Sequence, residues 1–422
     1  MTFFISLWML FQIVGQTPAG EKPPEKITLE RAVAEAREHN LELLAQRAQL
    51  PIADAQIITA GLRPNPTLSI TADHLDALGT RFSELNGGGP SEYAINTDFT
   101  WERAGKRTYR IAVAAKERAI SEFELLDALR RLTFEVQSAF IDVMVTQENL
   151  RVARENLASM TRIAEINAAR VTAGDLSQVE LKRSQLAALQ LENALNQAEL
   201  ALRSTKDRLH FLMGRTGSGA YLEVIGEFRR DPNPEPPEAI ERAALALRPD
   251  LRAATAEEER AAADVLLQTA VGRVDVGFGT EYRRQQGVNG VSNSLGFAVS
   301  VPLPLFNRNQ GELARARGEV NRATLKSAAI RASVLAEVRV ALDQQAMARK
   351  QLDHIESNML AQAREVRDIT QYAYQRGEAS FVELLDAERA YMETMQSYTM
   401  ARAEYGRSLY LIDAMSGKGG QR

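Results

Sequence analysis

The chain has 422 residues, of which 45% are hydrophobic and 25% are charged, and its formal net charge is −4. This profile is typical of an ordered protein, and the mild charge gives no electrostatic footprint for nucleic acid. The absence of cysteine excludes a disulfide scaffold, a thiol nucleophile and iron–sulfur ligation.

An apolar run opens the chain. Residues 3–14 are apolar except for Ser6 and Gln12. Such a run is too short to span a bilayer but fits the core of a signal peptide, which we predict over residues 1–20. The usual positive charge before the core is absent, so a buried N-terminal segment is the alternative.

The rest of the chain contains one unit twice. Gly174 begins Gly-Asp-Leu-Ser-Gln-Val-Glu-Leu, and Gly377, 203 residues later, begins Gly-Glu-Ala-Ser-Phe-Val-Glu-Leu. Gly214 and Gly417, which end the following apolar-periodic segments, keep the same offset. A constant offset over such a length indicates an internal repeat. The first repeat, a proline-rich linker and the second repeat are expected at 21–228, 229–237 and 238–417.

Each repeat is predicted to begin with a helix and continue with a hairpin. Apolar spacing near 3.6 predicts a helix from Thr28 to Ala60, kinked at Pro51, and a counterpart from Pro237 to Ala270. The period then changes to two, which predicts strands. These strands are expected at 66–75, 92–101, 273–283 and 294–302.

The strands have one apolar face and one polar or small face, and Trp101 suits an interfacial aromatic position. Strands of this length and pattern are the signature of an outer-membrane β-barrel. Two ordinary hairpins with one buried face are the alternative. Four strands cannot close a barrel, and an open edge in lipid leaves backbone groups unsatisfied. A spanning barrel must therefore be shared by several chains.

Very long helices follow each hairpin. They are expected at 105–172 and 176–213, then at 311–375 and 379–416. At about 1.5 Å per residue the longest reach roughly 100 Å, and their apolar spacing predicts coiled-coil-like packing. The predicted fold is mainly α with a small β part, a two-fold internal repeat and a long helical stalk.

The junctions between strands and long helices resemble those of the TolC family of outer-membrane efflux proteins. The segment from Val301 to Gly311 is similar to the junction in the heavy-metal and cation efflux, CzcC-like branch. Pro302 and Pro304 end strand pairing, while Gly311, like Gly105 in the first repeat, permits the bend into the stalk. The resemblance covers essentially the whole mature chain.

The resemblance implies a homotrimer with a twelve-stranded barrel in the bacterial outer membrane and a helical tunnel in the periplasm. It implies the exit duct of a tripartite efflux system, conducting substrates passively, metal cations among the candidates. Its implied partners are a periplasmic adaptor (membrane fusion) protein, an inner-membrane transporter of RND type and outer membrane lipid, with no nucleic acid. A periplasmic coiled-coil adaptor or scaffold without a pore is the alternative.

The resemblance also suggests functional residues at the far ends of the helices. It places the adaptor contact at the turns of Gly174 and Gly377, and an acidic entrance ring at Glu180, Glu383 and Asp386. Tyr374 matches a gating tyrosine. Ala379 stands where the family carries a gating arginine, so Arg376 or Arg183 is the candidate substitute. From the residues alone, the alternative is that these three acids are ordinary solvated positions on a helix.

No catalytic, cofactor-binding or metal-binding residue is predicted. The four histidines lie far apart in sequence without metal-ligand spacing. No nucleophile elbow or phosphate-binding glycine loop stands between a strand and a helix. An enzyme is therefore not expected.

Overall fold

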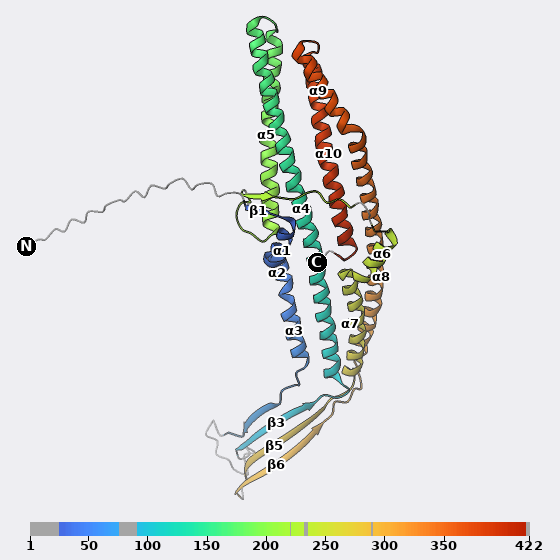
Figure 1. Cartoon of the computed structure of the whole chain (residues 1–422). Helices are drawn as coiled ribbons and strands as arrows, with labels where there is room; N and C mark the ends of the chain where they lie inside the picture. The colour runs from blue at the N-terminus through green and yellow to red at the C-terminus, as the bar shows by residue number, and fades with distance from the viewer. Residues whose placement is uncertain (1–24, 76–90, 220, 232–234, 288–289, 419–422) are drawn as a thin grey trace, which may run out of the picture. The chain divides into compact units, whose positions relative to one another are not determined.

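The computed structural model describes residues 25–75, 91–219, 221–231, 235–287 and 290–418 (Figure 1). The predicted signal peptide lies outside these residues. In chain order the elements are β1 (Glu25–Ile27), α1 (Leu29–His39), α2 (Leu41–Arg47), α3 (Gln49–Ala60), β2 (Thr67–Asp73), β3 (Glu92–Trp101), α4 (Lys106–Ala173), α5 (Gln178–Leu212), β4 (Leu222–Val224), α6 (Pro237–Leu247), α7 (Pro249–Val271), β5 (Val276–Gly287), β6 (Gly290–Ser300), α8 (Gln310–His354), the π-helical turn η1 (Ile355–Met359), α9 (Leu360–Arg376) and α10 (Phe381–Met415).

The chain forms two compact units, and each takes segments from both repeats. The first, which we call the hairpin unit, holds described residues 25–36, 136–228 and 352–403. The second, which we call the sheet unit, holds described residues 37–135, 229–351 and 404–418. The division therefore cuts across the sequence repeats instead of separating them.

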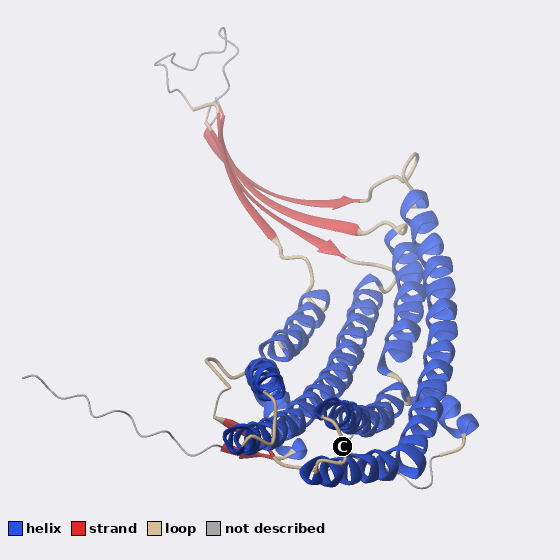
Figure 2. Ribbon diagram, turned by 90° about the horizontal axis from the view of Figure 1, so that it is seen from above, coloured by secondary structure: helices blue, strands red, loops and turns tan. Residues whose placement is uncertain are grey.

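The sheet unit contains one antiparallel sheet in the order β2-β3-β5-β6, which Figure 2 shows as a curved band. The register aligns side chains in rows across the strands. One row consists of Ile70, Ile95, Tyr282 and Leu295, and the next row, on the opposite face, of Ser69, Asn96, Glu281 and Gly296. Every member of the first row is more than 40% exposed. The alternation seen in the sequence thus becomes one continuous, solvent-accessible apolar face.

Strand β5 extends four residues beyond its predicted end at 283, because cross-strand pairing continues where the apolar alternation stops. Arg283 forms ion pairs with Glu92 on the neighbouring strand and with Glu281. Opposite charges on paired strands stabilise a sheet without any apolar signal in the sequence.

The N-terminal helix of each repeat is divided. The side chain of Asn40 accepts a hydrogen bond from the Leu43 amide at 3.0 Å and so begins α2. In the second repeat Arg248 precedes Pro249, which opens α7. The interruption expected at Pro51 falls at Ala48: α2 ends at Arg47 and α3 begins at Gln49, so Pro51 lies in the first turn of α3, where its missing N–H is harmless.

Two further features were not predicted. The parallel pair of β1 and β4 is only three residues long in each strand, which is too short to show a periodic pattern. The helix expected over 311–375 contains η1, where the hydrogen-bond register changes for five residues. Among the described residues no helix is long and apolar enough to span a membrane.

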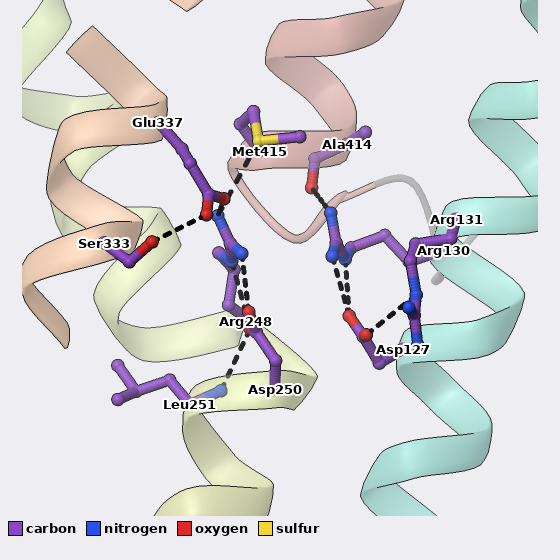
Figure 3. A network of polar contacts seen from close by, with 10 residues as sticks. All are labelled: Asp127, Arg130, Arg131, Arg248, Asp250, Leu251, Ser333, Glu337, Ala414 and Met415. Atoms are coloured by element: carbon purple, nitrogen blue, oxygen red, sulfur yellow. Dashed lines mark hydrogen bonds and ion pairs between the residues drawn. The ribbon is translucent and has the colours of Figure 1, made fainter. Parts of the chain in front are cut away.

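A polar network holds the middle of the sheet unit together (Figure 3). Arg248, whose side chain is 3% exposed, donates to Asp250 on α7 and to Glu337 on α8. Nearby, Arg130 on α4 bonds to Asp127 and to the carbonyl of Ala414 near the end of α10. Two buried guanidinium groups therefore join α4, α7, α8 and α10.

Candidate functional site: the helical turns and the contacts behind them

The two long hairpins of the hairpin unit turn by the same backbone device. Gly174 and Gly377 have φ of +86° and +80°, in the left-handed region that favours glycine. The following amides, of Asp175 and Glu378, bond to carbonyls five residues earlier at 2.8 and 2.9 Å. This pattern is a Schellman motif, so both helices end where the sequence repeat predicts.

The second turn is followed by a reciprocal cap. The Glu383 carboxylate accepts from the backbone amide of Ser380 at 2.6 Å and from its hydroxyl at 2.8 Å, and the Glu383 amide bonds back to that hydroxyl at 3.3 Å. The amide first, then the hydroxyl, lower the pKa of Glu383. The Glu383 carboxylate therefore caps the start of α10. This reciprocal arrangement is a capping box, and its sequence is Ser-Phe-Val-Glu.

The first turn has only half of this arrangement. The Ser177 hydroxyl accepts from the Glu180 amide at 3.2 Å, which caps α5. Glu180 itself is half-buried, while Asp386 is exposed. The three predicted ring acids therefore differ in character, with Asp386 the most accessible to ions.

Tyr374 lies inside the hairpin unit. It is 5% exposed, and its hydroxyl donates to the Asn167 side-chain oxygen at 2.7 Å, which links α9 to α4. Its ring packs against Phe381 with the centroids 5.9 Å apart, within a cluster that also holds Met160 and Leu384. Burial raises the pKa of Tyr374 despite the Asn167 hydrogen bond, so its hydroxyl stays protonated at neutral pH. The tyrosine joins the two hairpins of one chain.

Sequence reasoning missed two residues of α4, one bonded to Tyr374 and one beside the second turn. Asn167 is fully buried, and among the described residues its amide nitrogen finds no hydrogen-bond partner. Arg170 lies one turn further along α4, and a methyl group at Gly377 would sit 3.6 Å from its guanidinium. A polar residue among apolar helix positions is the signal that points to Asn167.

The arginine substitutes suggested for the family's gating position lie elsewhere. Arg376 stacks over the ring of Tyr372, with 4.6 Å from the guanidinium carbon to the ring centroid. Arg183 is exposed, and Ala379 packs against the Tyr374 cluster. The contacts of Gly377 therefore place the Arg170 side chain, from the other hairpin, beside the second turn.

Sequence reasoning also missed an acidic residue behind the turns. Glu388 lines a cavity of about 90 Å³ between the hairpins, together with Met160, Leu385 and Met392. Burial raises the pKa of Glu388, against the opposing charge of Arg367. Its place on the inner side of α10 follows only from the packing of four helices.

Three left-handed residues set the junctions between the sheet and the long helices. Ala104 and Gly105 have φ of +59° and +73° before α4, and Asn309 has φ of +63° before α8. The bend into α8 thus falls at Asn309 rather than at Gly311, which lies inside the first turn of the helix. Asparagine tolerates this conformation, and its side chain bonds to Gln268 on α7. Pro302 and Pro304 lie in the exposed segment that precedes it.

The described residues contain no cluster of three or more histidine, aspartate or glutamate side chains able to hold a metal ion. The arrangement instead offers a sheet with an exposed apolar face, long paired helices and acid-bearing turns. These are the parts of a conduit and of its contacts.

Known proteins similar in sequence to this chain are efflux and metal-resistance proteins. The family described as "Outer membrane efflux protein" matches residues 32–215 and 241–418, one segment in each repeat. The cobalt-zinc-cadmium resistance protein CzcC of Cupriavidus metallidurans is 24% identical over 393 residues, covering 93% of this chain and 90% of CzcC. The nickel-cobalt-cadmium resistance protein NccC of Alcaligenes xylosoxydans xylosoxydans is 26% identical, covering 79% and 74%.

Solved structures show the same fold. The outer-membrane channel OprN superposes with a TM-score of 0.76 at 17% identity, covering 93% of this chain and 91% of OprN. The mainly helical fold with few strands that the sequence predicts is thereby confirmed. Because the family match spans both repeats, the chain belongs to the outer membrane efflux protein family.

Proposed function

We propose that the chain is the outer-membrane exit duct of a tripartite efflux system and conducts its substrates passively. The observation that carries the proposal is the four-stranded sheet with one exposed apolar face, joined to helices of up to 68 residues. An apolar face of this kind suits lipid, and paired helices of this length suit a periplasmic conduit.

The free edges of the sheet support assembly into a trimer. Among the described strands, β2 and β6 each pair on one side only. Unpaired backbone groups in lipid cost several kcal/mol each, so the edges need partners. Three chains would close a sheet of twelve strands, with β6 of one copy beside β2 of the next.

The natural absence of cysteine allows a direct test of this assembly. Cysteines at Ser69 on β2 and at successive positions of β6, from Gly296 to Ser300, should give disulfide-linked trimers at one register. A cysteine at Thr280 on the interior strand β5, paired with the same Ser69 variant, is the control and should give no links between chains. Absence of linked trimers at every β6 position would contradict the shared sheet.

The entrance is proposed at the helical turns. Asp386 and Glu180 from three chains would concentrate cations at a narrow opening, while Tyr374 and Asn167 hold the hairpins of each chain together. Gly174 and Gly377 would mark the turns that meet a periplasmic adaptor, with an inner-membrane transporter of RND type supplying the substrate. Metal cations are the favoured cargo, since CzcC and NccC are named for metal resistance.

A further inference from the structure

The segment between β6 and α8 exposes an unusual number of apolar side chains. Leu303, Leu305 and Phe306 are 76%, 66% and 90% exposed. The segment is ordered by its own hydrogen bonds, from the Leu305 amide to the Leu303 carbonyl and from the Gln310 side chain to the Phe306 carbonyl. Exposed apolar groups held in place in this way indicate an interaction surface.

The segment continues the apolar face of the sheet. Leu295, Phe297 and Val299 lie on that face of β6, and Val301 follows with the same alternation. Trp101, at the corresponding end of β3, is 56% exposed and contacts Phe278 on the apolar face. The segment therefore lies at the helical end of the face for which lipid is proposed above.

Basic side chains accompany these apolar groups. The guanidinium of Arg308 bonds to the Pro304 carbonyl at 3.2 Å, which places it beside the apolar residues. Arg103 lies two residues after Trp101 and is exposed. Neither arginine has a carboxylate within ion-pair distance in the described part of the chain, whereas Glu102 and Asp275 nearby are paired with Arg110 and Lys106.

The charge of the neighbouring segment argues against a second copy of the chain as the partner that covers these residues. Where β6 of one copy lies antiparallel to β2 of the next, the residues after Ser300 come close to those before Thr67. That stretch, residues 61–66, contains Arg63 and no acid. It offers no charge complement to Arg308, whereas an anionic headgroup does.

We propose that Val301–Arg308, with Trp101 and Arg103, binds anionic phospholipid at the periplasmic face of the outer membrane. The apolar side chains would enter the acyl boundary while the arginines contact headgroup phosphates. This surface rests on the proposed membrane location but not on a pore, an adaptor or a transported substrate.

The test uses the full chain reconstituted in vesicles, with a single reporter tryptophan. Phe306→Trp is made in a background in which Trp8 and Trp101 are replaced by phenylalanine, and Leu303→Trp serves as a second reporter. Fluorescence quenching is compared between brominated phosphatidylglycerol and brominated phosphatidylcholine at equal mole fraction. Strand-edge disulfide trimers, measured on the same samples, report the proposed assembly separately.

We expect stronger quenching by the anionic lipid, with the preference lowered about five-fold by Arg308→Gln, since one arginine near an anionic surface contributes about 1 kcal/mol. Arg331→Gln, which removes an exposed arginine in the middle of α8, should leave the preference unchanged. Equal quenching by both lipids would overturn headgroup recognition. No quenching at either reporter, with trimers intact, would show that another copy covers the segment and would overturn the proposal.

Discussion

At the scale of single residues, the contacts behind the turns decide how firmly the two hairpins of one chain are joined. Tyr374 combines a buried ring with one hydrogen bond to Asn167. The Asn167 amide nitrogen already has no hydrogen-bond partner within the part of the chain that the structure describes. A buried polar pair with no spare partner is sensitive to the loss of either member.

Tyr374→Phe keeps the ring packing and removes the hydroxyl. The Asn167 oxygen then loses its donor, at a cost of about 1–2 kcal/mol to the joined arrangement. We expect a roughly tenfold rise in leak conductance if joining the hairpins keeps the entrance closed. Tyr372→Phe, at an exposed ring on the same helix, is the control. Equal leak conductance in the two variants would show that the Tyr374 hydroxyl does not keep the entrance closed.

Glu388 gives the hairpin unit a pH dependence. Its pKa in the folded chain is raised above the ordinary value of 4.5, so the folded chain retains a proton that the unfolded chain releases. Its stabilising contribution is fully present below pH 4.5, and it is lost as the pH rises through the pKa that Glu388 has in the folded chain. Glu388→Gln should therefore raise Tm at pH 7 and have a smaller effect at pH 4. Glu378→Gln, at an exposed position, is the control; a shift independent of pH at Glu388 would contradict its burial.

At the scale of elements, the two turns share a glycine but differ in their caps. Ser380 and Glu383 cap each other, whereas Ser177 caps α5 through its hydroxyl alone. The start of α10 therefore has more backbone groups satisfied than the start of α5.

Ser380→Ala should destabilise the start of α10 by about 1–2 kcal/mol, since both hydrogen bonds of the Ser380 hydroxyl are lost while the bond from the residue 380 amide to Glu383 can remain. Ser177→Ala is the matched variant and should cost less. Hydrogen exchange at the amides of residues 381–384 and 178–181 measures the two effects separately. A larger effect at Ser177 would contradict the reciprocal cap.

The buried network of Figure 3 is a second determinant at this scale. Arg248→Met would leave Asp250 and Glu337 without their shared cation. Breaking a fully buried ion pair costs about 3–5 kcal/mol, and the partial exposure of these two carboxylates places the expected loss below that. Although burial alone would raise the pKa of Asp250, the Arg248 hydrogen bonds and charge lower it. We expect a large fall in Tm. Arg322→Met, which breaks an exposed pair with Glu319 on α8, should change stability by less than about 1 kcal/mol. Similar losses in both variants would contradict the role of burial.

The elements that the sequence predicted are those with a long periodic signal. Alternation over β3 and 3.6-residue spacing over α4 persist for many residues, and the repeated glycines mark the turns. Other features involve only a few residues each, which is too short for a periodic pattern. They are the division of the first helix at Asn40, the register change in η1 and the strands β1 and β4. Asn167, Arg170 and Glu388 were missed because their roles depend on contacts between helices distant in sequence.

At the scale of the whole molecule, the two repeats contribute equivalent parts. Each supplies two strands to one sheet and a pair of long helices, and the family match covers a segment of each. A sheet whose two outer strands are unpaired among the described residues, and whose apolar face is exposed, is incomplete as a single chain in lipid. The proposed trimer, not the single chain, is therefore expected to be the unit of function.

Single-channel conductance of the detergent-purified protein in a planar bilayer tests the central claim most directly. We expect steady pores that a trivalent cation blocks from the side of the helical turns, with the block weakened by Asp386→Asn together with Glu180→Gln. Glu192→Gln, in the middle of α5, should leave the block unchanged. Absence of pores, from a protein that stays dispersed without detergent, would contradict the channel and favour a periplasmic scaffold.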